Sequence, residues 1–151
     1  MPDDHQPYRF QHSVDVRFKD IDVGGHAHHS HALVYFEEAR AAYWQDVAGR
    51  AGTGAVDYII AEATVRWHRR VLWPARLNVS VRVSLLGRKH FVMDYRIDSQ
   101  EGESLVSGTT VQVMYDYLAA VSKRLPADVH ARIIAHEGPF GRGGRWEGAA
   151  V

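Results

Sequence analysis

The feature that most constrains the fold is a change of hydrophobic periodicity after residue 57. Before it, apolar residues from Leu33 to Val47 recur every three or four positions, as the buried face of a helix requires. After it, four segments have the alternation or the β-branched composition of strands: 58–67, 77–85, 91–97 and 105–115. Short turns join most of them, and strands joined by short turns run antiparallel. One helix followed by four antiparallel strands predicts an α+β fold.

The segment before the helix adds one more strand. Val14, Val16 and Phe18 alternate with charged residues, the period of a half-buried strand. Ser30 is a favourable N-cap for the helix, and Gly49 fits its C-terminal end. We therefore expect a strand, one long helix and four further strands, with the sheet wrapped around the helix.

The length of the chain, 151 residues, is the usual size of one domain. We expect an N-terminal extension over residues 1–12, a domain over residues 13–136 and a C-terminal tail over residues 137–151. Residues 123–136 have the pattern of a short helix that closes the domain. Because the last 14 residues contain five glycines, the tail is expected to be loose.

Composition excludes several function classes. The absence of cysteine excludes a disulfide scaffold, a cysteine-ligated zinc site and a cysteine nucleophile. The 18 basic and 18 acidic residues balance, which argues against a nucleic-acid partner. No apolar run approaches the roughly 18 residues that span a bilayer, and residues 1–12 lack the apolar stretch of a signal peptide. We expect a soluble cytoplasmic protein with no membrane span.

The charges are unevenly distributed along the chain. Residues 63–93 contain no Asp or Glu. The same stretch carries seven basic residues: Arg66, Arg69, Arg70, Arg76, Arg82, Arg88 and Lys89. If these side chains share one face, they form a site for an anionic ligand. The alternative is a solvated face whose cations pair with acidic residues elsewhere.

One segment carries the residue types of a reactive site, Asp20-Ile-Asp22-Val-Gly-Gly-His26-Ala-His28-His29-Ser-His31. It places a carboxylate at a strand end, a glycine turn and then a helix N-terminus, whose unpaired N–H groups carry partial positive charge. Such an arrangement can polarise a carbonyl while the carboxylate, or water that it activates, attacks. The alternative is that the aspartates only cap the turn.

Residues 16–26 and 35–40 resemble the hotdog-fold acyl-CoA thioesterases, and more narrowly the 4-hydroxybenzoyl-CoA thioesterase group. The shared pattern is an aromatic residue, D-x-D-x-x-G, a short loop, and a helix with aromatic-x-E-x-A-R. The resemblance extends over about residues 13–117 and includes the stretches 58–62, 73–78 and 87–91. It implies the hotdog fold, an antiparallel sheet wrapped around one long central helix.

The resemblance also implies a reaction and its residues, the hydrolysis of an acyl-CoA thioester to a free acid and coenzyme A. Asp22 is the catalytic carboxylate, as nucleophile or as general base. The backbone N–H of His29 polarises the thioester carbonyl, and Arg88 and Lys89 bind the nucleotide phosphates of coenzyme A. No cofactor is needed, since coenzyme A is part of the substrate. The family further implies a homodimer joined edge to edge, with the active site between subunits and dimers pairing into homotetramers.

The histidines leave alternatives open. Four lie between residues 25 and 31, a density that suggests a metal site or an acid/base partner for Asp22. No His-x-x-x-His pair stands inside the predicted helix, so we expect no functional metal. Many relatives have Asn at one or both of the positions of His28 and His29, and an aromatic residue at Ala32. The alternatives are therefore a hydratase or dehydratase of the same fold, and a non-catalytic acyl-CoA-binding protein; Asp20 is expected to be structural.

Overall fold

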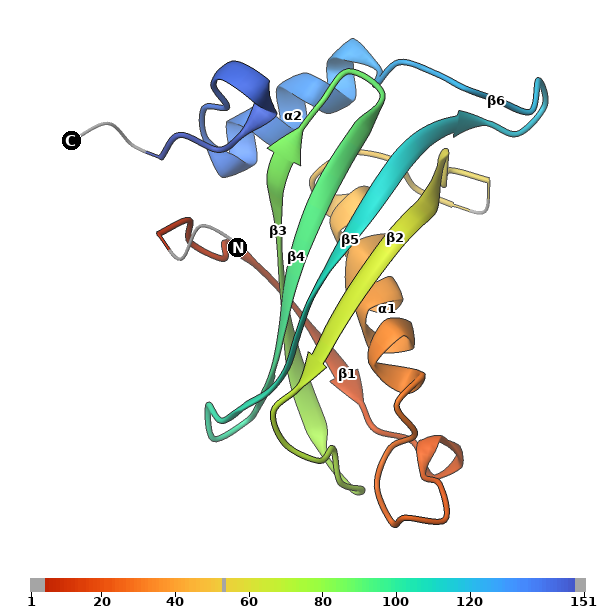
Figure 1. Ribbon diagram of the computed structural model, residues 1–151, viewed down its shortest axis with the longest axis vertical. Coiled ribbons are helices and arrows are strands. Elements are labelled where there is room, and N and C mark those ends of the chain that lie inside the picture. The colour runs from red at the N-terminus through yellow and green to blue at the C-terminus, as the bar shows by residue number, and fades with distance from the viewer. Residues whose placement is uncertain (1–4, 53, 149–151) are drawn as a thin grey trace.

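A computed structural model describes residues 5–52 and 54–148 (Figure 1). Its elements, in chain order, are β1 (Phe10–Asp15), the 3-10 helix η1 (Phe18–Asp20), α1 (His31–Asp46), β2 (Tyr58–Trp67), β3 (Arg76–Leu86), β4 (His90–Ser99), β5 (Ser104–Asp116), β6 (Val121–Ser122), α2 (Ala127–Glu137) and the 3-10 helix η2 (Arg142–Gly144).

One antiparallel sheet organises the described chain. Its strand order is β1-β3-β4-β5-β2, and the short β6 pairs with the end of β5. β1 and β2 are therefore the edge strands. In Figure 1 the sheet lies in front and α1 runs along its far face, while α2 sits at the end where β3 turns into β4. The architecture confirms the α+β class expected from the sequence.

The strand predictions after the helix are confirmed to within two residues. The expected segment 58–67 is β2, and the other three segments lie inside β3, β4 and β5. Alternation predicts β3 and β4 well because their apolar side chains are buried: Val79, Val81 and Val83 are all inaccessible to solvent. Burying each such side chain contributes about 1.5–3 kcal/mol, which favours this register over a slip by one residue. β2 is exposed along most of its length, and its β-branched composition predicts it instead.

The helix α1 buries a different face from the one expected at its start. Tyr35, Phe36, Ala39 and Tyr43 are fully buried against the sheet. Leu33, assigned to the buried face by its spacing, is 42% exposed, whereas its neighbour Ala32 is buried, so the buried face of the first helical turn is centred on Ala32 and not on Leu33.

The prediction that the first strand continues to Phe18 is wrong, and the prediction of Ser30 as the N-cap of α1 is confirmed in position only. β1 ends at Asp15, and Phe18 is 74% exposed in η1, where its ring packs edge-on against Trp73. The strand ends early because the buried Asp20 accepts a hydrogen bond from the Arg17 backbone N–H at 3.0 Å, which curls the chain. Ser30 does not cap α1 with its side chain, since its hydroxyl bonds His28 Nδ1 at 2.8 Å instead.

The ends of the chain are more closely packed than expected. The boundary proposed after residue 12 falls inside β1. The segment after α2 folds back along β3, and the indole of Trp146 donates a hydrogen bond to the Glu137 carbonyl at 2.9 Å. Gly144 lies so close to β3 that a Cβ there would be 2.4 Å from the Leu86 carbonyl oxygen. The expectation of a loose tail is therefore wrong up to residue 148; residues 149–151 lie outside the described residues.

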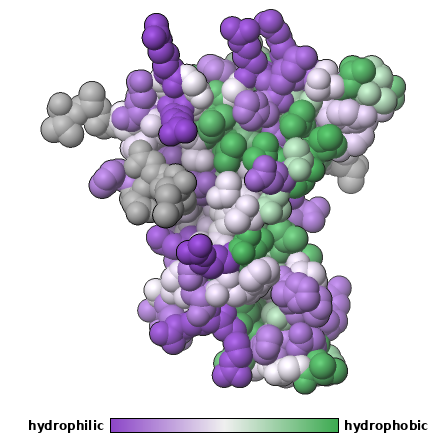
Figure 2. Space-filling view, viewed as in Figure 1, coloured by the Kyte–Doolittle hydropathy of each residue, from purple (hydrophilic) through white to green (hydrophobic). Residues whose placement is uncertain are grey.

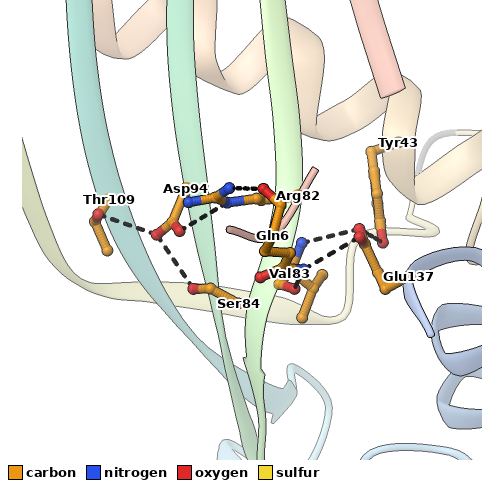
Figure 3. A network of polar contacts seen from close by, with 8 residues as sticks. All are labelled: Gln6, Tyr43, Arg82, Val83, Ser84, Asp94, Thr109 and Glu137. Atoms are coloured by element: carbon orange, nitrogen blue, oxygen red, sulfur yellow. Dashed lines mark hydrogen bonds and ion pairs between the residues drawn. The ribbon is translucent and has the colours of Figure 1, made fainter. Parts of the chain in front are cut away.

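Buried polar groups tie α2 to the sheet (Figure 3). The Glu137 carboxylate accepts hydrogen bonds from the Tyr43 hydroxyl at 2.8 Å, the Val83 N–H at 3.0 Å and the Gln6 amide at 3.3 Å. Burial raises the pKa of Glu137, although these hydrogen bonds oppose the shift. The network fixes the C-terminal end of α2 against both α1 and β3.

Candidate functional site

The turn between η1 and α1 holds Asp22 in a fixed geometry. Its Oδ1 accepts a hydrogen bond from the Gly24 N–H at 2.8 Å, and its own N–H donates to the His26 carbonyl at 3.0 Å. Gly25 adopts a φ of 81°, a conformation that favours glycine and lets the chain reverse. The first bond occupies one carboxylate oxygen, and within residues 5–52 and 54–148 the other oxygen accepts no hydrogen bond.

Asp20 anchors the same turn from inside. It is 1% exposed, and its Oδ2 accepts hydrogen bonds from the Tyr35 hydroxyl at 2.8 Å and the Arg17 N–H. Nε2 of His31 lies 3.2 Å from Oδ1. Burial disfavours the charge, but the two hydrogen bonds and the His31 ring outweigh it, so the pKa of Asp20 is lowered. These contacts fit the structural role expected for Asp20.

A cavity of about 340 Å³ opens beside Asp22. Its lining comes from the turn, the start of α1, the last residue of β2 and the chain that follows it: Asp22, His26, Ala27, His28, His29, Ala32, Tyr35, Trp67, His68, Arg69, Arg70 and Val71. The structure thus brings together two of the predicted site residues, Asp22 and His29. In the described part of the chain the backbone N–H of His29 has no hydrogen-bond partner. A carboxylate and a free N–H donor at a helix start therefore share one cavity.

The histidine rings form part of the cavity wall. The rings of His28 and His29 lie 3.9 Å apart, and His29 meets Trp67 edge-on at 6.3 Å. No group of three or more His, Cys, Asp or Glu side chains that could hold a metal ion occurs within residues 5–52 and 54–148. The imidazole rings of His28 and His29 and the indole of Trp67 thus contact one another in series, the last pair edge to face.

Arg88 and Lys89 lie far from this cavity within one protomer. They occupy the turn between β3 and β4, at the opposite end of the sheet from the Asp22 turn (Figure 1). The structure does not bring these two predicted site residues to Asp22 in a single chain.

The acid-free basic stretch does not form one face, and the alternative of cations that pair with acidic residues elsewhere holds for Arg69 and Arg82. Arg82 is buried and pairs with Asp94 at 3.1 Å. Arg69 pairs with Glu103 at 2.7 Å, beside the Asp22 cavity. Successive strand residues point to opposite faces, so a run of cations in sequence is divided between locations in the fold.

Sequence reasoning missed the contribution of the chain that follows β2. Trp67, His68 and Arg70 line the Asp22 cavity, although they are separated from Asp22 by more than 40 residues in sequence. They meet it because the Ala27 N–H donates to the Val71 carbonyl at 2.8 Å, which pins one loop to the other. The one signal in the sequence was an aromatic residue, Trp67, at the end of the predicted strand 58–67.

The family model of the "Thioesterase-like superfamily" matches residues 16–133, most of the chain. The chain belongs to the thioesterase-like superfamily. A thioesterase from Thermus thermophilus, solved in complex with coenzyme A and zinc, is 31% identical over 85% of this chain and 94% of its own, with a TM-score of 0.74. This superfamily membership confirms the resemblance seen in the sequence.

Two further relatives widen the comparison. A 1,4-dihydroxy-2-naphthoyl-CoA thioesterase from Synechocystis shares the fold at 19% identity and a TM-score of 0.75, over 86% of this chain and 98% of its own. The uncharacterized protein YsmA of Bacillus subtilis is 26% identical over 106 residues, which are 70% of this chain and 72% of its own. The hotdog fold expected from the sequence is therefore confirmed. No helix among the described residues of this superfamily member is long and apolar enough to cross a membrane.

Proposed function

We propose that this protein hydrolyses an acyl-CoA thioester to a free carboxylic acid and coenzyme A. The observation that carries the proposal is the cavity shared by the Asp22 carboxylate and the unpaired backbone N–H of His29. Hydrolysis of a thioester needs a group that attacks the carbonyl carbon and a donor that stabilises the resulting oxyanion. Membership of the thioesterase-like superfamily supports the same reaction.

Asp22 acts on the thioester carbonyl in one of two ways. As a general base, it takes a proton from water, and the hydroxide adds to the carbonyl carbon. As a nucleophile, its oxygen adds directly, the C–S bond breaks, and water hydrolyses the resulting anhydride. In both routes the oxyanion faces the His29 N–H and the positive end of α1. The leaving thiolate is a stable anion with a pKa of about 8.5, so no dedicated acid and no cofactor are required.

The complete site requires two protomers. β2 is an edge strand with exposed apolar side chains, Ile59 at 37%, Ile60 at 41% and Trp67 at 48%. Pairing of two β2 edges across a two-fold axis runs the strands antiparallel. The end that carries Arg88 and Lys89 in one protomer then lies beside the Asp22 end of the other. The proposed assembly is therefore a homodimer, two of which associate into a tetramer.

A panel of thioesters tests the proposed function. The purified protein is incubated with acyl-CoAs from acetyl to palmitoyl, with benzoyl-CoA and with 4-hydroxybenzoyl-CoA, and free thiol is followed. Release from at least one substrate is expected, and the preferred one names the acyl class. Tight binding of acyl-CoA with no release across the panel would instead identify a non-catalytic binding protein.

One observation keeps a hydratase as the second candidate. Asp22 Oδ1 and His26 Nε2 each lie 3.1 Å from the position that a Cβ on Gly24 would take, so a carboxylate and an imidazole flank one small space. Such a pair can add a proton and a hydroxide across a double bond. Loss of the enoyl absorbance of crotonyl-CoA without thiol release would favour the hydratase.

A further inference from the structure

The cavity beside Asp22 has two chemically different parts. Its floor consists of buried residues with apolar side chains, Ala27, Ala32 and Val71. Its rim consists of exposed residues with ionisable side chains, His29, His68, Arg69 and Arg70. Hydrophilic side chains predominate at this end of the molecule, the lower end in Figure 2. An acyl group bound here therefore meets apolar surface and ionisable side chains within one cavity.

The charges of the rim are only partly neutralised by the chain itself. Asp22 is the only acidic residue that lines the cavity within the described part of the chain, whereas Arg69 and Arg70 contribute two guanidinium groups. The Glu103 carboxylate lies 2.7 Å from the Arg69 guanidinium and neutralises it. The Arg70 side chain has no ion-pair or hydrogen-bond partner among residues 5–52 and 54–148. Arg70 thus offers the cavity a cation that is free to bind an anionic group of a ligand.

Hydrogen bonds on both sides hold the backbone of Arg70 in place. The Arg69 N–H donates to the Leu105 carbonyl at 3.1 Å, and the Val71 carbonyl accepts from the Ala27 N–H at 2.8 Å. These bonds join the chain that follows β2 to β5 on one side and to the Asp22 turn on the other. Because its two neighbours are anchored, Arg70 can bind a ligand without the entropic cost of ordering a loop.

His28 adds an uncharged donor to the same cavity. The Ser30 backbone N–H donates to Nδ1 of His28 at 3.2 Å, so Nδ1 carries no proton when the ring is neutral. The proton is then on Nε2, which has no hydrogen-bond partner within residues 5–52 and 54–148. An alkyl group packed against this N–H would take it out of water without a partner, which is unfavourable, whereas an oxygen acceptor would satisfy it.

We propose that the acyl group hydrolysed at this site ends in a carboxylate, so that the substrate is the coenzyme A thioester of a short dicarboxylic acid. The Arg70 guanidinium binds the terminal carboxylate through two parallel hydrogen bonds, and the Nε2–H of His28 is the second donor to it. The apolar floor contacts the methylene groups between the two ends. A volume of about 340 Å³ is at the small end of ligand sites, which favours a short acyl group. The inference rests on the proposed function, because it names the acyl class of that reaction.

Matched pairs of substrates test the acyl class. Glutaryl-CoA differs from valeryl-CoA, and adipyl-CoA from hexanoyl-CoA, only in that a carboxylate replaces the terminal methyl group. We expect kcat/KM, measured from thiol release, to favour the dicarboxylic member of at least one pair by about tenfold or more, which is about 1.4 kcal/mol. Equal values within both pairs would overturn the proposal.

Substitutions assign the preference to the proposed residues. The preference should vanish in Arg70→Gln and should fall in His28→Phe, which keeps a ring and removes the N–H. It should persist in the matched control Arg66→Gln, which removes an exposed arginine of β2 that does not line the cavity. A preference that survives in Arg70→Gln would overturn the proposal. An equal loss for both members of a pair would overturn it as well, since Arg70 would then bind the phosphates that both substrates share.

Thioether analogues separate this inference from the proposed function. S-(4-carboxybutyl)-CoA and S-pentyl-CoA lack the thioester carbonyl and bind without turnover. In calorimetric titrations the wild type should bind the carboxylate analogue about tenfold more tightly, and Arg70→Gln should bind the two equally. If the wild type shows this difference but hydrolyses no thioester, the proposed function fails and the anionic ligand class stands. If it releases thiol but prefers the carboxylate in neither measurement, hydrolysis stands and the inference fails.

Discussion

The carboxylate of Glu137 allows the account of the fold to be tested quantitatively. Glu137→Ala removes the acceptor of three hydrogen bonds and leaves the Val83 N–H and the Tyr43 hydroxyl buried without that partner. Each unsatisfied buried group costs about 1–3 kcal/mol, so the loss is about 2–6 kcal/mol. Domains are usually stable by about 5–15 kcal/mol. The variant should therefore be severely destabilised although it changes no residue of the Asp22 cavity.

Urea denaturation at pH 7 measures this loss. The matched control is Glu137→Gln, which keeps an oxygen for Tyr43 and Val83 and should be less destabilised than Glu137→Ala. An unchanged slope with a lower midpoint would show that stability alone has changed. A loss below about 1 kcal/mol in Glu137→Ala would refute the assignment of these bonds as stabilising.

The same residue predicts a dependence of stability on pH. Burial raises the pKa of Glu137 above its ordinary value of 4.5. The folded state therefore keeps a proton that the unfolded state releases, and the free energy of unfolding falls as pH rises from 4.5 through the raised pKa. In Glu137→Gln this component should be absent, so the difference in urea midpoint between wild type and variant should change with pH in that window. A constant difference would contradict the raised pKa.

Two further predictions concern the packing that supports the site. Gly108→Ala places a Cβ 2.6 Å from the buried Phe36 ring. Overpacking of this kind should lower the free energy of unfolding, measured by urea denaturation, by about 1–3 kcal/mol. A variant as stable as the wild type would show that the neighbouring side chains rearrange to accommodate the methyl group. Asp20→Asn should lower the free energy of unfolding by about 1–3 kcal/mol at pH 7. Because the pKa of Asp20 is lowered, that cost should shrink as pH falls below its ordinary value of 3.8, and a cost that persists unchanged would contradict the lowered pKa.

The sequence predicts elements well where one physical requirement dominates. The alternation of β3 follows from burial of its apolar side chains, and β3 is confirmed. The strand 58–67 is confirmed as well, predicted by its β-branched composition although most of its side chains are exposed. Phe18 shows where this reasoning ends, since its spacing continues the strand while the buried carboxylate of Asp20 turns the chain away. Hydrophobic periodicity carries no information about that hydrogen bond between the Arg17 backbone and the Asp20 side chain.

The sequence likewise predicted some residues of the candidate site and missed others. Asp22 and His29 are close in sequence and lie at one cavity, as the turn and helix start predict. Trp67 and Arg70 join that cavity only through the pairing of two distant loops, which no local pattern encodes. Contacts between segments distant in sequence could be identified only from the structure.

The most direct test of the central claim is the rate of thiol release by Asp22→Asn on the best substrate of the panel. General acid–base groups commonly contribute about 10²–10⁴-fold, so turnover should fall by at least about a hundredfold while the fold and acyl-CoA binding persist. Asp46→Asn, at the exposed C-terminal end of α1, is the matched control and should keep the wild-type rate. Near-normal turnover in Asp22→Asn would contradict the assignment of Asp22 as the carboxylate that attacks, or activates water for attack on, the thioester.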